Sequence, residues 1–131
     1  MRLLEDAQTG ERLGPYRYVL TKEMALFVAS NVGQESLETN HAGGVIAPNC
    51  VTDNDYAVLL HEVFTSKEAV HTKAEHYYIN PPVVGKEMIV SGQIIDRYSR
   101  RGREYLMFAT EIKDEDGTEI VRSNNVLLIN L

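Results

Sequence analysis

The sequence predicts an α+β fold in which an antiparallel sheet of about five strands curves around one long helix. The first observation is a stretch from Gly43 to Phe64 that contains a glycine pair, a proline and then a long, mostly apolar helical pattern. The second is a series of alternating, β-rich segments from Val70 onward. An apolar helix must bury its surface against other elements, and half-buried strands must bury one face. Packing the strands around the helix satisfies both requirements.

The N-terminal part predicts one short strand and one helix. Met1 to Gly14 is polar and ends in a Gly-Pro turn signal, and Tyr16–Leu20 alternates as a half-buried strand does. Thr21 is a suitable N-cap for a helix over Lys22–Val32, and Gly33 is suited to end it. The helical spacing predicts one apolar face, made of Met24, Phe27, Val28 and Val32.

The segment from Gln34 to His41 is polar and has no period, so we expect a loop. Pro48 stops a brief extended piece over Val45–Ala47. The central helix is expected over Asn49–Phe64, capped by Asn49, Thr52 or Asp53. Its core-facing residues are predicted to be Tyr56, Leu59, Leu60 and Val63.

The C-terminal half predicts four strands: His71–Asn80, Glu87–Tyr98, Glu104–Lys113 and Thr118–Ile129. Tight turns at Arg100–Arg103 and Asp114–Gly117 separate the last three. Short turns join antiparallel neighbours, so these three strands should lie side by side in chain order.

Composition limits the function classes. The chain has 131 residues, which suits a single domain spanning residues 1–131, and its net charge of −6 argues against a general polyanion binder. The single cysteine, Cys50, cannot form an intrachain disulfide, which favours a reducing, cytoplasmic setting. The sequence has no stretch typical of a signal peptide or a membrane span, so no membrane partner is expected.

Three phrases carry a resemblance to a known family. They are GERLGPYRYVLTKEMALFVASNVGQ (residues 10–34), GGVIAPN (43–49) and YINPPVVGKEM (78–88). With the order of elements, they resemble the hot-dog fold and, within it, the MaoC-like (R)-specific enoyl-CoA hydratases and dehydratases. The resemblance covers nearly the whole chain. It implies an acyl thioester as substrate, bound as acyl-CoA or acyl-pantetheine, with no cofactor.

The resemblance also implies a catalytic plan, from which this sequence departs. The family places an Asp and a His after the first helix, and the amide N–H groups at the mouth of the central helix polarise the thioester carbonyl. In this sequence Asn49 and Cys50 occupy the mouth of the central helix, where their N–H groups would polarise the carbonyl. Gln34 stands where the Asp is expected and Thr39 where the His is expected. Proton transfer must therefore be assigned to other residues.

Two histidines are candidates for the general acid or base. His41 lies in the loop after the first helix, with Glu35 or Glu38 as its carboxylate, and otherwise is a solvated loop residue. His76 lies on the first long strand, where it either faces the helix mouth as a base or is a half-buried strand residue.

The central helix carries further candidates. Asp53 could act with His76 in a thioesterase-like site, although Asp53 and Asp55 near a helix start also suit simple capping. His61 and Glu62 are expected at the exposed end of the helix. Cys50 at a helix start could be reactive, but a lone cysteine more often packs as a small apolar residue.

Four arginines gather on one predicted hairpin: Arg97, Arg100, Arg101 and Arg103. They either form a solvated turn or bind the phosphates of coenzyme A or a pantetheine arm, because guanidinium groups match phosphate oxygens. A nucleic-acid partner is not expected, because the rest of the chain is acidic. No histidine or cysteine spacing suggests a metal site.

Three functional hypotheses follow. The first is a hydratase or dehydratase in which His41 or His76 is the acid or base. The second is a thioesterase in which His76 and an acid such as Asp53 or Glu35 activate water. The third is a non-catalytic hot-dog subunit of a heteromeric enzyme. All three imply a homodimer or a heterodimer with another hot-dog chain, because exposed terminal strands need cover.

Overall fold

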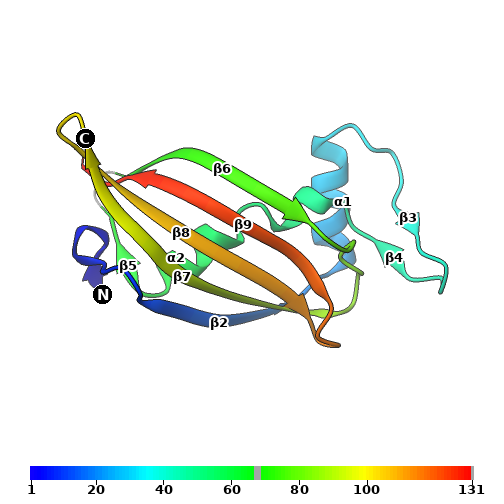
Figure 1. The fold of residues 1–131 in the computed structure, drawn as a ribbon. Helices are drawn as coiled ribbons and strands as arrows, with labels where there is room; N and C mark the ends of the chain where they lie inside the picture. Colours follow the sequence, from blue (N-terminus) through cyan, green and yellow to red (C-terminus); the bar gives the residue numbers. More distant parts are fainter. Residues whose placement is uncertain (67–68, 131) are drawn as a thin grey trace.

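The fold is one curved antiparallel sheet with a helix lying along one face (Figure 1). A computed structural model describes residues 1–66 and 69–130. The five main strands follow the order β2-β7-β8-β9-β6. Their bounds are β2 Arg12–Val19, β6 Val70–Tyr78, β7 Glu87–Arg100, β8 Arg103–Asp114 and β9 Glu119–Leu128. The predicted fold class is confirmed.

The remaining elements are short. Two small ribbons, β1–β5 and β3–β4, flank the main sheet. Their strands are β1 Arg2–Leu3, β3 Glu38–Thr39, β4 Val45–Ile46 and β5 Phe64–Thr65. The helices are the 3₁₀ segments η1 Leu4–Asp6 and η2 Asn49–Thr52, and the α-helices α1 Lys22–Asn31 and α2 Asp55–His61.

Both predicted hairpin turns are confirmed. Arg100 pairs with Arg103 across the β7–β8 turn, so Arg101 and Gly102 form a two-residue connection. Both have positive φ, 52° and 76°, as a type I′ turn requires. In the β8–β9 turn the Asp114 carboxylate accepts hydrogen bonds from the backbone N–H groups of Asp116 and Thr118.

Strand β2 begins earlier than predicted. The Gly14-Pro15 pair, which the sequence suggested as a turn, lies inside the strand, where the register with β7 shifts between Leu13 and Tyr16. Gly14 has φ +89°, and a Cβ placed on it would lie 2.7 Å from the carbonyl oxygen of Val90. Only glycine fits this bulge without strain.

The prediction of one long helix over Asn49–Phe64 was wrong in its bounds. The segment divides into η2 and the seven-residue α2, and Phe64 belongs to β5, where it pairs with Arg2. The predicted side-chain caps are also absent in the described residues. The Thr52 hydroxyl instead donates to the Asn49 carbonyl at 3.1 Å, a local bond that competes with regular α-helix formation.

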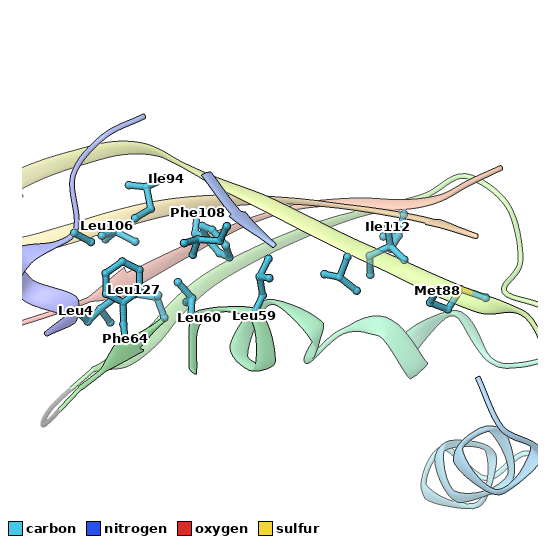
Figure 2. Close-up of a cluster of buried hydrophobic side chains, with 14 of the residues drawn as sticks. Leu4, Leu59, Leu60, Phe64, Met88, Ile94, Leu106, Phe108, Ile112 and Leu127 are labelled. Carbon is cyan, nitrogen blue, oxygen red and sulfur yellow. The ribbon is translucent and has the colours of Figure 1, made fainter. Parts of the chain in front are cut away.

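The core lies between α2 and the sheet, as predicted. Leu59 and Leu60 rise from α2 toward Phe108 of β8, and Phe64 and Leu127 lie beside them (Figure 2). Alternate residues of β8 face the helix, so Leu106, Phe108 and Ile112 are buried. The predicted partners Tyr56 and Val63 are partly buried against this cluster.

Helix α1 packs with a different face from the one predicted. Thr21 caps it as expected, accepting a hydrogen bond from the Met24 N–H at 3.2 Å. Its buried residues, however, are Ala25 and Ala29, whereas Met24 and Phe27 are exposed. Small residues let the helix approach η2 closely, and the larger apolar side chains are left on the surface.

The segment predicted as a loop over Gln34–His41 contains a strand. Residues Glu38 and Thr39 pair with Ile46 and Val45 as an antiparallel ribbon. This ribbon extends beyond α1, away from the main sheet (Figure 1). The Asn40 side chain accepts hydrogen bonds from two backbone N–H groups of its turn, which explains why a polar segment without a period is ordered.

Candidate functional site

Three side chains from two distant segments meet at the start of the central helical region. The Tyr78 hydroxyl donates a hydrogen bond of 2.6 Å to Oδ1 of Asp53. The same oxygen lies 4.0 Å from Nε2 of His76. The His76 ring stacks on the Tyr78 ring with centroids 5.9 Å apart. We call Asp53, His76 and Tyr78 the polar cluster.

The alternation of side chains along β6 explains why His76 and Tyr78 lie together. His76 and Tyr78 are two residues apart on β6, so both side chains lie on the same face of the sheet. His76 pairs with Ser123 and Tyr78 with Val121 of β9, and Val121 belongs to the core that packs on α2. The cluster therefore lies on the helix side of the sheet.

Two of the three side chains of the polar cluster are partly sheltered from water, whereas Tyr78 is 42% exposed. The side chains of His76 and Asp53 are 18% and 34% exposed. Burial raises the pKa of Tyr78, and its hydrogen bond to Asp53 raises it further, so Tyr78 remains a protonated donor at neutral pH. A histidine that a carboxylate can stabilise, still reachable from solvent, is suited to proton transfer.

The backbone just before the cluster offers two N–H groups. Asn49 and Cys50 open η2 after Pro48, and in the described part of the chain neither N–H donates to a backbone or side-chain acceptor. This agrees with the general rule that the first N–H groups of a helical segment lack internal partners. Cys50 is half-buried and carries a free thiol.

An apolar pocket of about 250 Å³ lies further along α2, between this helix and β6. Its walls include Leu60, Phe64, Leu127 and the ring of Tyr56, which packs on His71 with centroids 4.7 Å apart. His71 lies on the same strand as His76. The polar cluster and the pocket therefore lie at different points along β6, on the same side of the sheet.

A second polar pair lies on the other side of the helix. Tyr18 of β2 donates a hydrogen bond of 2.7 Å to Oδ2 of Asp55, which is only 9% exposed. Burial raises the pKa of Asp55 to about 7, and the nearby charge of Asp53 adds to the shift. The sequence suggested that Asp55 caps the helix, but its side chain makes no capping bond.

The other predicted acid–base residues do not join the polar cluster. His41 lies in the exposed turn of the β3–β4 ribbon, and Glu35 is exposed in the segment before it. Glu38 is exposed on β3. His61 and Glu62 lie at the exposed end of α2, as expected.

The four arginines divide into two groups. Arg97 holds the N-terminal segment: its guanidinium donates to the carbonyls of Glu5 and Ala7, at 3.0 Å for Ala7, and forms an ion pair with Glu104. Its pairing is therefore structural, contrary to the predicted phosphate role. The other three line a groove of about 620 Å³ together with Lys73 and the stacked rings of Tyr98 and Tyr105; they are Arg100, Arg101 and Arg103.

This arginine groove is distant from the polar cluster within one chain. Tyr105 pairs with Leu128 of β9, whereas His76 pairs with Ser123 of the same strand. Five residues of strand cover about 17 Å. Tyr105 also lies on the opposite face of the sheet from its buried neighbour Leu106.

Sequence reasoning missed two members of the site region. Tyr78 shares a face with His76, and the two-residue spacing on a predicted strand could have indicated this. The Tyr18–Asp55 pair joins a strand to a helix across 37 positions, and no sequence pattern signals it.

Among residues 1–66 and 69–130, no three His, Cys, Asp or Glu side chains gather as a metal site would require. No helix of the described chain is long and apolar enough to cross a membrane.

Comparisons with known proteins agree on the architecture. The chain superposes on the (R)-hydratase PhaJ1 from Pseudomonas aeruginosa with a TM-score of 0.79 at 12% identity, covering 95% of this chain and 83% of that one. It superposes on the 3R-hydroxyacyl-ACP dehydratase complex HadBC from Mycobacterium tuberculosis with a TM-score of 0.78 at 13% identity, covering 95% and 99%. This chain has the hot-dog fold.

A third solved structure is similar as well. A thioesterase superfamily member from Thermus thermophilus superposes with a TM-score of 0.65 at 12% identity, covering 92% of this chain and 82% of that one. No model of a protein family matches the sequence, and no curated protein matches it either. The hot-dog architecture is therefore established from structure.

Proposed function

We propose that this hot-dog chain acts on acyl thioesters as a hydratase or dehydratase, with His76 as the general acid and base. The observation that carries the proposal is the polar cluster, in which Oδ1 of Asp53 lies 4.0 Å from Nε2 of His76. The likeness in fold to an (R)-hydratase and a hydroxyacyl-ACP dehydratase supports this reaction class.

The chemistry assigned to His76 is a proton transfer in two steps. In hydration, the neutral imidazole accepts a proton from water while the water oxygen bonds to the β-carbon of an enoyl thioester. The imidazolium then donates that proton to the α-carbon, and dehydration is the reverse. Asp53 stabilises the imidazolium, and Tyr78 holds the Asp53 carboxylate by its hydrogen bond.

The same proposal gives the rest of the substrate a place. The N–H groups of Asn49 and Cys50 are suited to polarise the thioester carbonyl, on which negative charge develops when the α-carbon gains or loses its proton. The acyl chain then extends into the pocket beside Leu60 and Phe64. No cofactor is needed for this reaction.

Thioester hydrolysis is the second candidate, and one observation favours it. Asp53, just before α2, and His76, on β6, are the acid and the histidine of the thioesterase hypothesis. By contrast, Gln34 and Thr39 occupy the positions at which a hydratase is expected to have its Asp and His. In this reaction His76 would deprotonate water for attack on the thioester carbonyl, and the thiol would leave. The likeness to a thioesterase superfamily member supports keeping this candidate.

The assay that separates the candidates follows two signals with trans-2-enoyl-CoA substrates of short and medium length. Loss of enoyl absorbance reports hydration, and release of free thiol reports hydrolysis. Wild type, His76→Ala and Asp53→Asn are compared with Glu62→Gln, a matched acid-to-amide control because Glu62 is exposed at the end of α2 and does not line the pocket. His41→Ala tests the other predicted histidine.

We expect His76→Ala to lower the rate by about 100-fold or more, and Asp53→Asn by a smaller factor, with Glu62→Gln unchanged. Loss of activity in His41→Ala with full activity in His76→Ala would contradict the assignment. If a folded wild-type protein gives neither signal, the proposal that this chain catalyses the reaction on its own is wrong. The third hypothesis, a non-catalytic subunit of a heteromeric enzyme, is then favoured.

A further inference from the structure

A second pocket lies between α1, β2 and the central helical region, and the proposed reaction does not use it. Its volume is about 280 Å³, and five apolar side chains form much of its wall: Met24, Phe27, Val28, Val51 and Val58. Met24 and Phe27 are 42% and 68% exposed. The large apolar side chains that α1 leaves on the surface therefore belong to the wall of this pocket.

One charged group lies in this apolar surrounding. Asp55 lines the pocket, whereas no lysine, arginine or histidine of the described residues does. Its Oδ2 accepts the hydrogen bond from Tyr18, and within the described chain its Oδ1 has no partner. The fully buried side-chain atoms that lack a partner there belong to Asn125 alone. Oδ1 of Asp55 is therefore open to the pocket and can accept a hydrogen bond from a ligand.

Aromatic rings lie beside this carboxylate. Tyr16 and Tyr18 of β2 both line the pocket, with ring centroids 5.8 Å apart, and Phe27 adds a third ring from α1. The faces of aromatic rings attract cations. A buried carboxylate without a cationic partner is costly, so a ligand that brings a positive charge is favoured over a neutral one. An anion is disfavoured, because Asp53 adds a second negative charge nearby.

We propose that this pocket binds a small organic cation, namely a protonated primary amine that carries an alkyl or aromatic group. The ammonium group donates to Oδ1 of Asp55, and the apolar group lies against Val51 and Val58. The volume is at the lower end of the range for small-molecule sites, so the ligand is small. The inference does not depend on the proposed function, because no residue of the polar cluster lines this pocket.

The surroundings of Asp55 give this binding a pH dependence. The titratable groups around it are Tyr16 and Tyr18 of β2 and Asp53 before α2, while α1 and η2 contribute apolar side chains to the pocket. Burial, with the charge of Asp53, raises the pKa of Asp55 to about 7. A cation binds the ionised carboxylate, so its affinity should be about tenfold lower at pH 6 than at pH 8.

Calorimetry with three probes of similar shape tests the site. Phenethylamine is cationic, 2-phenylethanol is neutral and 3-phenylpropionate is anionic. The proteins are wild type, Asp55→Asn, Val58→Phe, which fills the pocket and keeps the charge, and Glu62→Gln. The last is a matched acid-to-amide control, because Glu62 is exposed at the end of α2 and does not line this pocket. Thermal melting shows whether each variant is folded.

We expect wild type and Glu62→Gln to bind phenethylamine about tenfold or more tightly than 2-phenylethanol at pH 8. Asp55→Asn should lose both this preference and the pH dependence, and Val58→Phe should weaken the binding of both probes. Equal binding of the amine and the alcohol by wild type overturns the inference. A preference that persists in Asp55→Asn, or a folded wild type that fails to bind millimolar phenethylamine, also overturns it. The proposed function stands or falls separately, in the enoyl-CoA assay.

Discussion

At the scale of single residues, Asp55 lies in an environment unlike that of an ordinary surface carboxyl group. It is buried, it accepts one hydrogen bond from Tyr18, and Asp53 lies near enough for its charge to matter. Burial raises the pKa of Asp55 to about 7 from an ordinary value of 3.8. The folded protein therefore prefers Asp55 in its protonated form.

This preference predicts a fall in stability as pH rises. Below 3.8 the carboxyl is protonated in both states, and between 3.8 and about 7 it is ionised only in the unfolded chain. Folding is therefore opposed increasingly until the pH passes about 7. Asp55→Asn removes this effect, so we expect it to stabilise the protein at pH 8 by on the order of 2–4 kcal/mol relative to wild type.

Denaturant unfolding at several pH values checks this prediction. The Asn amide oxygen still accepts the Tyr18 hydrogen bond, so the two proteins should have similar stability near pH 4. A constant difference between wild type and Asp55→Asn at every pH would show that the pKa of Asp55 is the same in the folded and unfolded states, and would contradict the prediction.

Gly14 gives a second prediction at this scale. Gly14 and Gly10 both have strongly positive φ, +89° and +95°, but a Cβ on Gly14 would lie 2.7 Å from the Val90 oxygen while one on Gly10 meets nothing within 4 Å. We expect Gly10→Ala to cost about 1 kcal/mol of unfolding free energy and Gly14→Ala about 3 kcal/mol. Equal losses, measured by urea unfolding, would mean that the β2 bulge can adjust to a methyl group.

At the scale of elements, the β7–β8 hairpin carries a candidate phosphate-binding site that is separate from the polar cluster. Its three free-standing arginines line one groove with Lys73, while Arg97 is engaged by the N-terminal segment. The predicted phosphate role therefore rests on Arg100, Arg101 and Arg103 alone. Three guanidinium groups in one groove are suited to bind the phosphate groups of a nucleotide.

Replacing these three arginines by glutamine tests that role. If the groove binds the nucleotide part of coenzyme A, KM for an acyl-CoA should rise about tenfold with kcat little changed, because the loss affects binding and not the reacting atoms. The same variant should use the matching acyl-pantetheine thioester as well as wild type does. An equal rise in KM for both substrates would point to a loss of folding or packing and not of phosphate contacts.

Elements also show where sequence patterns mislead. The apolar spacing of α1 is real, but the buried face is the one with Ala25 and Ala29, and Phe27 remains 68% exposed. Helical periodicity identifies a face and cannot say what covers it. In the same way, Gln34–His41 lacked any pattern, and its strand forms only because Asn40 orders the turn and Glu38 and Thr39 find Val45 and Ile46.

At the scale of the whole molecule, β6 is an edge strand of nine residues with no neighbour on its outer side in the described chain. A long exposed edge invites pairing with another strand. We expect this protein to form a dimer through β6, either with itself or with a second hot-dog chain.

A pair of proline variants tests that arrangement in the purified protein. Backbone N–H groups of adjacent strand residues point to opposite edges, so in Ala74→Pro and Glu75→Pro one variant removes a bond to β9 and the other removes an outward N–H. We expect wild type to be dimeric by light scattering and one of the two variants to be a folded monomer. Two folded variants that both remain dimeric would place the interface elsewhere.

The sequence by itself determined the order of the five main strands and two helical regions, the hairpins and the apolar residues of the central segment. These depend on local turn chemistry and on alternation, and Arg101-Gly102 and Leu59–Leu60 occur where those patterns indicated. The resemblance to MaoC-like enzymes also indicated the hot-dog fold, and the thioesterase hypothesis named Asp53 and His76 among several candidates. It did not choose between His41 and His76.

Only the tertiary structure decided which candidates lie together. His76 and Tyr78 meet Asp53 because β6 pairs with β9 in one register, which places their side chains on the helix side of the sheet. The same long-range pairing buries Asn125 and Asp55 and places the arginine groove at the far end. Contacts between residues far apart in sequence depend on strand order and packing, and neither leaves a local pattern in the chain.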